Sequence, residues 1–316
     1  MGFTNFPHGI TSFGIPIIGS SGTDIPVTTG SYFFVSSTTG SDVNTGTEPT
    51  KAFATLDYAL SKCTANKMDV VVLMPGHSET ITGAGGITLD VAGVKVVGMG
   101  SGSSRPTFLM DGATTVTMLV TAADCSIENC IFKAGHADIV MFAHITAKNF
   151  VFKNNSVIEN VANENFITCI SIGTEDNDSD GCQIIGSDFI QGDAADLHAI
   201  IINKDQNDVK IIGNKVIGLY DASPYSAIYS PSTEVLLNFF MAFNTIYNKH
   251  NDNNTPTVNL ACTTSTGWVV YNTAQGKDND GETHFLGGAG GLCFSQNYAA
   301  GVAGTASGYL YPGADS

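Results

Sequence analysis

One short pattern recurs along most of this 316-residue chain and constrains its fold more than any other feature. The pattern is an apolar residue, any residue, a second apolar residue, any residue, and then Asn or Gly, usually with another apolar residue a few positions later. Consecutive copies begin 24 to 32 residues apart, which lies within the ~20–50 residue range of solenoid repeats. They begin at Val70, Val94, Cys125, Phe150, Cys182, Val209, Phe239 and Gly267, and the last two are looser copies.

Each copy predicts a short strand that ends at a sharp corner, because Asn and Gly tolerate the left-handed backbone that such a corner needs. Successive strands can stack on one another, which buries their inward apolar side chains and pairs the main-chain groups. A leucine-rich repeat is the main competing solenoid, but it requires regular Leu positions that Val, Ile, Phe and Cys occupy here. The repeat therefore predicts an all-β solenoid.

One helix is predicted before the repeats begin, over residues of about 52–64. Phe53, Leu56, Leu60 and Cys63 fall at i, i+3, i+7 and i+10 and form one apolar stripe. Such a helix would cover the open end of the apolar stack.

The two ends of the chain differ from the repeats and predict three regions: an arm at 1–31, the solenoid at 32–283 and a Gly/Ala-rich segment at 284–316. The arm has neither a helical nor a strand period, but it is too apolar to be a solvated tail. We expect it to dock on its own domain or on a partner through Phe3, Phe6, Phe13, Ile15, Ile17 and Ile18. We expect the small residues of the last segment to run along the solenoid or between subunits.

Four stretches near the start carry a family resemblance: Tyr32-Phe-Phe-Val, Gly40-Ser-Asp-Val-Asn-Thr-Gly-Thr, Lys51-Ala-Phe-Ala-Thr-Leu and Asp69-Val-Val-Val-Leu-Met-Pro-Gly. Together they resemble the N-terminal entrance of the pectin-lyase-like proteins, with Ala52 in place of the family's usual Pro. The resemblance implies a right-handed, single-stranded parallel β-helix with an N-terminal capping helix. The family includes carbohydrate-active enzymes, adhesins and structural proteins of tailed phages.

The two ends of the chain point to one group of proteins within this family. Residues 5–19, 293–298 and 308–316 are similar to the ends of uncharacterised β-helical proteins from tailed-phage genomes. This similarity implies a homotrimeric virion protein that is assembled in the host cytoplasm. The function it favours is a capsid decoration or head-spike protein, attached through its arm to the major capsid protein or another virion protein. The alternative is a tail spike that binds or cleaves a host surface glycan as a glycoside hydrolase or lyase.

The charge balance excludes other partners. The formal net charge is −16, only 13% of the residues are charged, and Arg105 is the single arginine. Nucleic acids and anionic membranes require clustered basic residues, so we exclude both. The longest apolar run, 235–243, is too short to span a membrane. No Lys or Arg precedes Lys51, so we expect no conventional secretory signal.

The seven cysteines also bear on the compartment in which the chain folds. They are scattered along the chain and mostly set among apolar neighbours. This distribution predicts buried thiols in a reducing cytosol rather than a disulfide framework.

Catalytic candidates follow from the enzyme alternative. A glycosidase needs two carboxylates on either side of the scissile bond, and neighbouring strands can supply them. Asp188 and Asp193 are the pair to test, although Asp beside small residues also serves simply to make turns. A lyase of the pectate-lyase type is expected to use a basic residue. For Arg105, in a loop near the N-terminal end, the alternative role is a structural cation that contacts carbonyls or acids.

A calcium loop is the one metal site that the sequence suggests, and no other cofactor is required. Asp176, Asp178 and Asp180 match the first half of an EF-hand loop, with Gly181 at the turn. Ser187 stands where the final Glu ligand is needed, which excludes an EF-hand. The segment therefore predicts either a calcium-binding loop or an acidic solvated turn.

Overall fold

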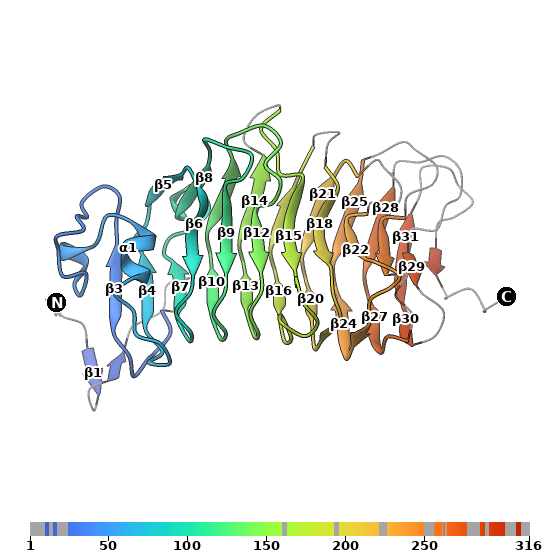
Figure 1. Ribbon diagram of the computed structural model, residues 1–316, viewed down its shortest axis with the longest axis horizontal. Coiled ribbons are helices and arrows are strands. Elements are labelled where there is room, and N and C mark those ends of the chain that lie inside the picture. Colours follow the sequence, from blue (N-terminus) through green and yellow to red (C-terminus); the bar gives the residue numbers. More distant parts are fainter. Residues whose placement is uncertain are drawn as a thin grey trace, which may run out of the picture.

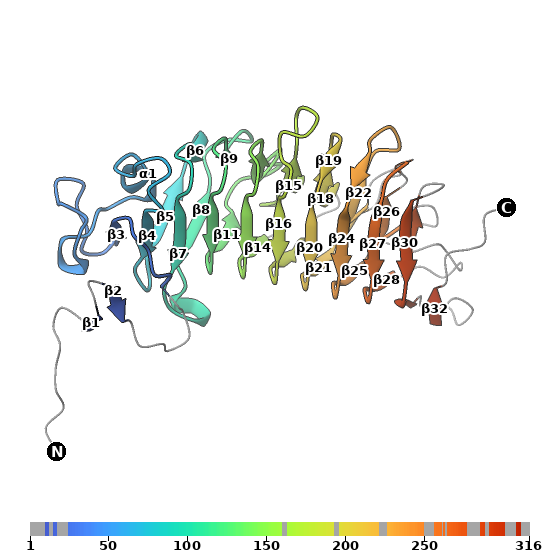
Figure 2. The same ribbon diagram turned by 90° about the horizontal axis from the view of Figure 1, so that it is seen from below.

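The strands of this protein follow one another along a single axis from one end of the molecule to the other (Figures 1 and 2). The computed structural model describes residues 10–12, 15–17, 25–159, 163–192, 196–220, 226–249, 256–260, 262, 264–276, 285–287, 291–300 and 308–310. Almost every strand in these ranges pairs in parallel with the equivalent strand of the next turn. The predicted all-β solenoid is confirmed.

Three sheets form the faces of the solenoid. In stacking order, the first contains β3 (Tyr32–Val35), β4 (Val70–Leu73), β7 (Lys95–Gly98), β10 (Ser126–Glu128), β13 (Val151–Lys153), β16 (Gln183–Ile185), β20 (Lys210–Ile212), β24 (Phe239–Ala242), β27 (Gly267–Val270) and β30 (Leu292–Ser295). The second contains β5 (Ser78–Ile81), β8 (Thr107–Met110), β11 (Ile131–Ala134), β14 (Ser156–Glu159), β17 (Asp188–Ile190), β21 (Lys215–Gly218), β25 (Thr245–Asn248), β28 (Thr273–Gly276), β31 (Asn297–Ala300) and the antiparallel β32 (Gly308–Leu310). The third contains β6 (Ala84–Leu89), β9 (Thr117–Val120), β12 (Ala143–Ile145), β15 (Thr168–Ile172), β18 (His198–Ile202), β22 (Ile228–Ser230), β26 (Val258–Leu260) and β29 (Phe285–Gly287).

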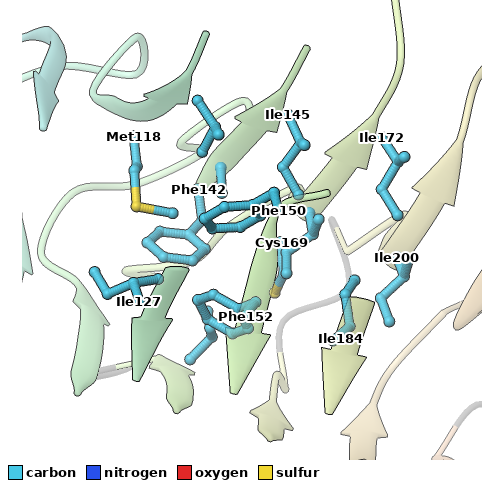
Figure 3. Packing of buried hydrophobic residues seen from close by; sticks show 14 of the residues in the cluster. Met118, Ile127, Phe142, Ile145, Phe150, Phe152, Cys169, Ile172, Ile184 and Ile200 are labelled. Carbon is cyan, nitrogen blue, oxygen red and sulfur yellow. The ribbon is translucent and has the colours of Figure 1, made fainter. Parts of the chain in front are cut away.

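The core lies inside the three sheets and is built from rows of apolar side chains in direct register. One row of the first sheet runs through Val71, Val96, Ile127, Phe152, Ile184, Ile211, Met241 and Val269, all fully buried. Met118 of the third sheet and Phe142, which precedes β12, belong to the same buried cluster, and the Phe142 ring contacts Phe152 of this row (Figure 3). Burying each large apolar side chain contributes roughly 1.5–3 kcal/mol, so the repeated rows supply most of the driving force for folding.

Helix α1 (Leu56–Leu60) is shorter than the predicted 52–64. Phe53 belongs to extended backbone instead, because its N–H donates to the Phe34 carbonyl and its own carbonyl accepts from Ser36. The helix begins after Thr55, whose hydroxyl accepts from the N–H of Tyr58. Leu56 and Leu60 are buried in the core, as the apolar stripe predicts. A 3-10 turn, η1 (Pro49–Lys51), precedes the helix, and another, η2 (Gly102–Ser104), follows β7.

The two ends are more regular than the sequence predicts. Within the arm, β1 (Ile10–Ser12) and β2 (Ile15–Ile17) pair antiparallel, although the segment has no clear strand period. At the other end, β29, β30 and β31 add to all three sheets, so the stack continues beyond the expected boundary at residue 283. The remaining small sheet joins β19 (Gln206–Asn207) to β23 (Leu236–Leu237). No helix within the described ranges is long and apolar enough to cross a membrane.

Candidate functional site

The corner between the first and second sheets contains one residue with a positive φ at each of seven successive turns. These residues have φ values of 53° to 66° and are Asn129, Asn154, Gly186, Gly213, Phe243, Tyr271 and Gln296. Asn and Gly adopt this backbone readily, whereas for a bulky side chain it is an outlier. Holding Phe243 and Tyr271 there costs roughly 1–2 kcal/mol each relative to glycine.

A buried row of polar side chains, the asparagine ladder, holds these corners in place. It consists of Asn155, Asn214, Asn244, Asn272 and Asn297, with Ser187 in the turn after Asn155. Within it, Asn244 Oδ1 accepts from the N–H of Asn214 at 2.9 Å, and Asn244 Nδ2 donates to the Ile211 carbonyl at 2.8 Å. Asn272 Oδ1 accepts in turn from the N–H of Asn244 at 3.0 Å. The ladder satisfies main-chain groups that the corners would leave unpaired.

The ladder also corrects the register of the two looser repeats. Their sequence pattern places Asn244 and Asn272 at the corners. In the structure these side chains lie one position further on, inside the ladder, and the corners are Phe243 and Tyr271.

A groove, here called the aromatic trough, lies beside these two corners on the outer face of the first sheet. It has a volume of about 400 Å³. It is lined by Phe240, Phe243, Trp268, Val270, Tyr271, Ser295 and Gln296.

Strand pleating gives the trough its walls and floor, because alternate residues of a strand point to the same face. Phe240 and Trp268 are partners in adjacent strands and form one wall. Val270 and Ser295, also partners, form the floor. The corner residues Phe243, Tyr271 and Gln296 complete the lining of the trough.

The aromatic rings of the trough are unusually exposed. Phe243 is 61% exposed, Trp268 55% and Tyr271 52%. The Phe243 and Tyr271 rings stack in parallel, with centroids 5.2 Å apart and an interplanar angle of 2°. Exposed apolar groups gathered in one place mark interaction sites more often than scattered ones do.

The trough combines apolar walls with a few neutral hydrogen-bonding groups. None of its lining residues is charged. The hydroxyls of Tyr271 and Ser295 and the amide of Gln296 can each donate and accept hydrogen bonds. This combination suits an uncharged ligand with flat apolar faces and hydroxyl groups at its edges.

Arg105 has the structural role that the sequence left open. Its guanidinium donates to the carbonyls of Cys130 and Asn154 at 2.7 and 2.6 Å and to the hydroxyl of Ser156 at 3.1 Å. Burial lowers the pKa of the guanidinium, although Asp188 nearby acts against this shift. With its donors directed at three protein groups, Arg105 ties successive turns together.

The structure describes only one of the two aspartates of the proposed catalytic pair. Asp188 begins β17 and is the strand partner of Ser156 and Lys215 in the second sheet. Asp193 lies outside the described residues. The pair therefore stays a prediction.

The three aspartates of the predicted calcium loop point to different partners. Asp178 accepts hydrogen bonds from the N–H groups of Thr174 and Glu175, at 2.9 and 3.0 Å. Burial acts to raise the pKa of Asp178, but these bonds and those from neighbouring hydroxyls outweigh it and lower that pKa. Asp180 accepts from Lys148 Nζ at 3.0 Å.

Asp176 instead meets acids from the next two turns. Ligand atoms of Asp176, Asp205 and Glu234 all lie within 4.8 Å of one another. This group, here called the acidic corner, was not predicted, because its members are about 30 residues apart in sequence. The calcium site itself stays a prediction.

The predicted docking residues of the arm fall largely outside the described structure. Phe3, Phe6, Phe13 and Ile18 lie outside the described residues, and Ile15 and Ile17 belong to β2. Docking through the arm therefore stays a prediction, as do a capsid partner, a homotrimer and a virion location.

The thiols are mostly buried. Five cysteines are buried, Cys63 is half-buried and Cys293 is exposed, and all seven are free. Burial raises the pKa of Cys130 and of Cys182 to about 12, so both stay as unreactive thiols at neutral pH.

Comparison with known proteins identifies the fold. No protein-family model and no curated protein matches the sequence. The chain is similar to the solved structure of pectate lyase Pel9A, with a TM-score of 0.51 and 13% identity over 85% of this chain and 70% of that one. This chain has a pectin-lyase-like parallel β-helix fold.

Two further solved structures are similar at lower scores. A rhamnogalacturonan lyase has a TM-score of 0.41 and 15% identity over 80% of this chain and 76% of that one. A GH136 lacto-N-biosidase from Eubacterium ramulus has a TM-score of 0.32 and 12% identity over 86% and 68%. Because one fold hosts many activities, the function has to be argued from the site.

The trough is what sequence reasoning missed. Its signal is present as a series of doublets, one per turn, in which a corner residue precedes a ladder residue: Asn154-Asn155, Gly186-Ser187, Gly213-Asn214, Phe243-Asn244, Tyr271-Asn272 and Gln296-Asn297. Aligning the repeats on the second member of the doublet brings the two aromatic residues into the corner position.

Proposed function

We propose that this protein binds polysaccharide chains along the aromatic trough. The observation that carries the proposal is the presence of Phe243 and Tyr271 at consecutive left-handed corners beside the exposed Trp268. Asn or Gly fills the four preceding corners at no such cost. Strained backbone of this kind clusters at functional sites.

The position of the trough argues against a peptide added as an extra strand. Strand addition needs an exposed sheet edge with free N–H and C=O groups. Both β24 and β27 are paired on each side, β24 with β20 and β27 and β27 with β24 and β30. Their main-chain groups already bond to neighbouring strands, so the ligand has to be held by side chains.

The chemistry of the walls favours sugars over nucleic acid bases. Single-stranded nucleic acids also stack on aromatic side chains, but they require a positively charged groove. The trough has no charged lining residue, and the chain carries a net charge of −16. A pyranose ring offers an apolar C–H face to a ring such as Trp268 and hydroxyls to Ser295 and Gln296.

Tryptophan fluorescence can test whether an oligosaccharide binds in the trough. Trp268 is the only tryptophan, so tryptophan-selective fluorescence reads the trough directly. We expect an oligosaccharide that binds there to shift the emission to shorter wavelength, because it displaces water from the indole. Trp268→Ala should abolish binding in an independent calorimetric titration, whereas Tyr298→Ala, which removes an exposed aromatic ring from the second sheet, should leave it intact.

Tyr271→Gly separates function from stability. Glycine relieves the left-handed strain, so the variant should melt at the same or a higher temperature while binding falls by about tenfold or more. Unchanged binding in both the Trp268 and Tyr271 variants would contradict the proposal. So would a screen in which a proline-rich peptide shifts the emission and no polysaccharide does, since aromatic grooves also bind such peptides.

This proposal is the binding half of the polysaccharide-binding or -cleaving alternative. Cleavage by Asp188 and Asp193 would be a separate property, tested by assaying Asp188→Asn for loss of reducing-sugar release. The virion role implied by the ends of the chain remains a second proposal from sequence, in which the trough would face a host surface glycan.

A further inference from the structure

The ion-paired groups of the first sheet lie away from the aromatic trough. Towards the N-terminal end of the same outer face, Lys95 and Lys153 lie on either side of Glu128, with N–O distances of 3.8 and 3.6 Å. The charged residue next to the trough is Lys210, the strand partner of Phe240 in the preceding turn. Within the trough itself the lining carries no charge.

The only arginine is not directed to the trough. Arg105 is held by the carbonyls of Cys130 and Asn154, several turns before Trp268. Carboxylate recognition favours an Arg fork or a cluster of lysines. Among the described strands of the first sheet that border the trough, Lys210 is the cation beside it, and the net charge of −16 repels a polyanion approaching from solution.

The walls disfavour an anionic ligand for a second reason. The face of an aromatic ring carries the negative part of its quadrupole. Trp268 and the Phe243–Tyr271 stack therefore attract the weakly positive C–H face of a sugar and repel a carboxylate. The remaining polar groups, Ser295 and Gln296, both donate and accept, which matches hydroxyl groups better than an acceptor-only carboxylate.

We infer that the trough selects neutral polysaccharides and excludes polyuronates. The inference rests on the proposed function, because it names the chemical class of the glycan bound at the same site. It separates this chain from pectate lyase Pel9A, a protein of similar fold whose name denotes an acidic substrate.

The test compares neutral and acidic oligosaccharides of equal length, with gluco- and xylo-oligosaccharides against oligogalacturonates and alginate fragments. We expect the neutral set to bind at least about tenfold more tightly, since the trough offers the acidic set no paired cation. Neutral binding should change by less than about twofold when salt shortens the Debye length from ~10 Å to ~3 Å. Lys210→Gln should leave neutral binding unchanged, and Ser295→Lys, which places a cation in the floor, should create oligogalacturonate binding that weakens with salt.

The outcomes distinguish this inference from the proposed function. If oligogalacturonates bind the native chain as tightly as neutral sugars, and lose affinity in Trp268→Ala and in salt, the neutral class is wrong while the trough remains a glycan site. If neutral sugars bind but Trp268→Ala and Tyr271→Gly have no effect, the site lies elsewhere and both fail. If no oligosaccharide of either kind binds, the proposed function fails and this inference fails with it.

Discussion

Phe243 and Tyr271 show how much a single corner residue contributes to the surface of this protein. A corner glycine exposes only backbone, whereas each of these residues adds an exposed ring in direct line with the next turn. Because the ladder below is unchanged at both turns, the chain acquires a new surface without a change in its core.

His198 is a second residue whose environment has a measurable consequence. It is 3% exposed, its ring stacks on Tyr229 at 4.9 Å, and Nδ1–H donates to the Ser226 carbonyl at 2.8 Å. Burial lowers the pKa of His198 from 6.5 to about 4, and the bond to Ser226 opposes this shift. The folded protein therefore keeps this imidazole neutral where the unfolded chain would protonate it.

We predict that His198 makes the folded protein less stable as the pH is lowered. Between pH 6.5 and about 4 the unfolded state binds one more proton than the folded state does at His198. Stability is therefore retained above 6.5 and lost as the pH falls towards 4, by up to about 3 kcal/mol. His198→Gln has no titrating ring and should lose this part of the slope in urea denaturation measured at several pH values. Parallel pH profiles for the two proteins would contradict the prediction.

At the residue scale, the sequence predicts the buried residues better than the exposed ones. The apolar residues of the repeats are in the core, as expected, because alternation specifies which side chains face inward. The aromatic corners could not be predicted in the same way, since Phe and Tyr in an apolar strand are read as core residues. Only the register of the neighbouring turns shows that Phe243 and Tyr271 lie beyond the end of the strand.

At the element scale, the solenoid brings together residues that are distant in sequence. The asparagine ladder is one result, and the acidic corner is another. Asp176 follows β15, Asp205 follows β18 and Glu234 follows β22, so each lies in the loop between the third and first sheets. Equivalent loops of successive turns lie next to each other, and their carboxylates converge.

The calcium prediction from the sequence can be tested at this acidic corner, because Asp176 belongs to both the predicted loop and the corner. Three carboxylates this close repel one another, and a hard cation with oxygen ligands relieves the repulsion. The melting temperature should rise with calcium and fall in EDTA. Glu234→Gln should raise the melting temperature in EDTA and remove most of the response to calcium.

Asp178→Asn is the informative control for that prediction. Asp178 is held by protein donors, so its replacement should lower the melting temperature by a similar amount with and without calcium. A calcium response that disappears in Asp178→Asn but persists in Glu234→Gln would show that calcium binds at the predicted loop of residues 176–180 and not at the acidic corner. An EDTA-insensitive melting temperature in the native protein would exclude both sites.

At the scale of the whole molecule, the fold follows from the sequence more fully than the site does. Copies of the repeat at 24 to 32 residues specify one turn each, and the entrance at residues 32–76 identifies the type of solenoid. The variation in spacing enters as loops of different length, and those loops determine which side chains meet. The acidic corner depends on three such loops, so a repeat pattern alone does not locate it.

We predict that the arm and the stack fold as independent parts. The fully buried core residues begin at Val35, and β1 and β2 pair with each other. Ile25 packs near β4, so a truncation has to stop before it. Removing residues 1–20 should therefore leave a folded β-helix whose melting temperature and Trp268 fluorescence match those of the full chain.

The same truncation tests what the arm is for. If it docks the protein to a partner or to further copies, the shortened chain should no longer co-sediment with virion particles, or should show a smaller mass by light scattering. If the shortened chain unfolds instead, the arm is part of the solenoid's own end and the docking proposal is wrong. Glycan binding distinguishes these cases further, because a trough formed by β24, β27 and β30 should keep its affinity when only the opposite end of the stack is shortened.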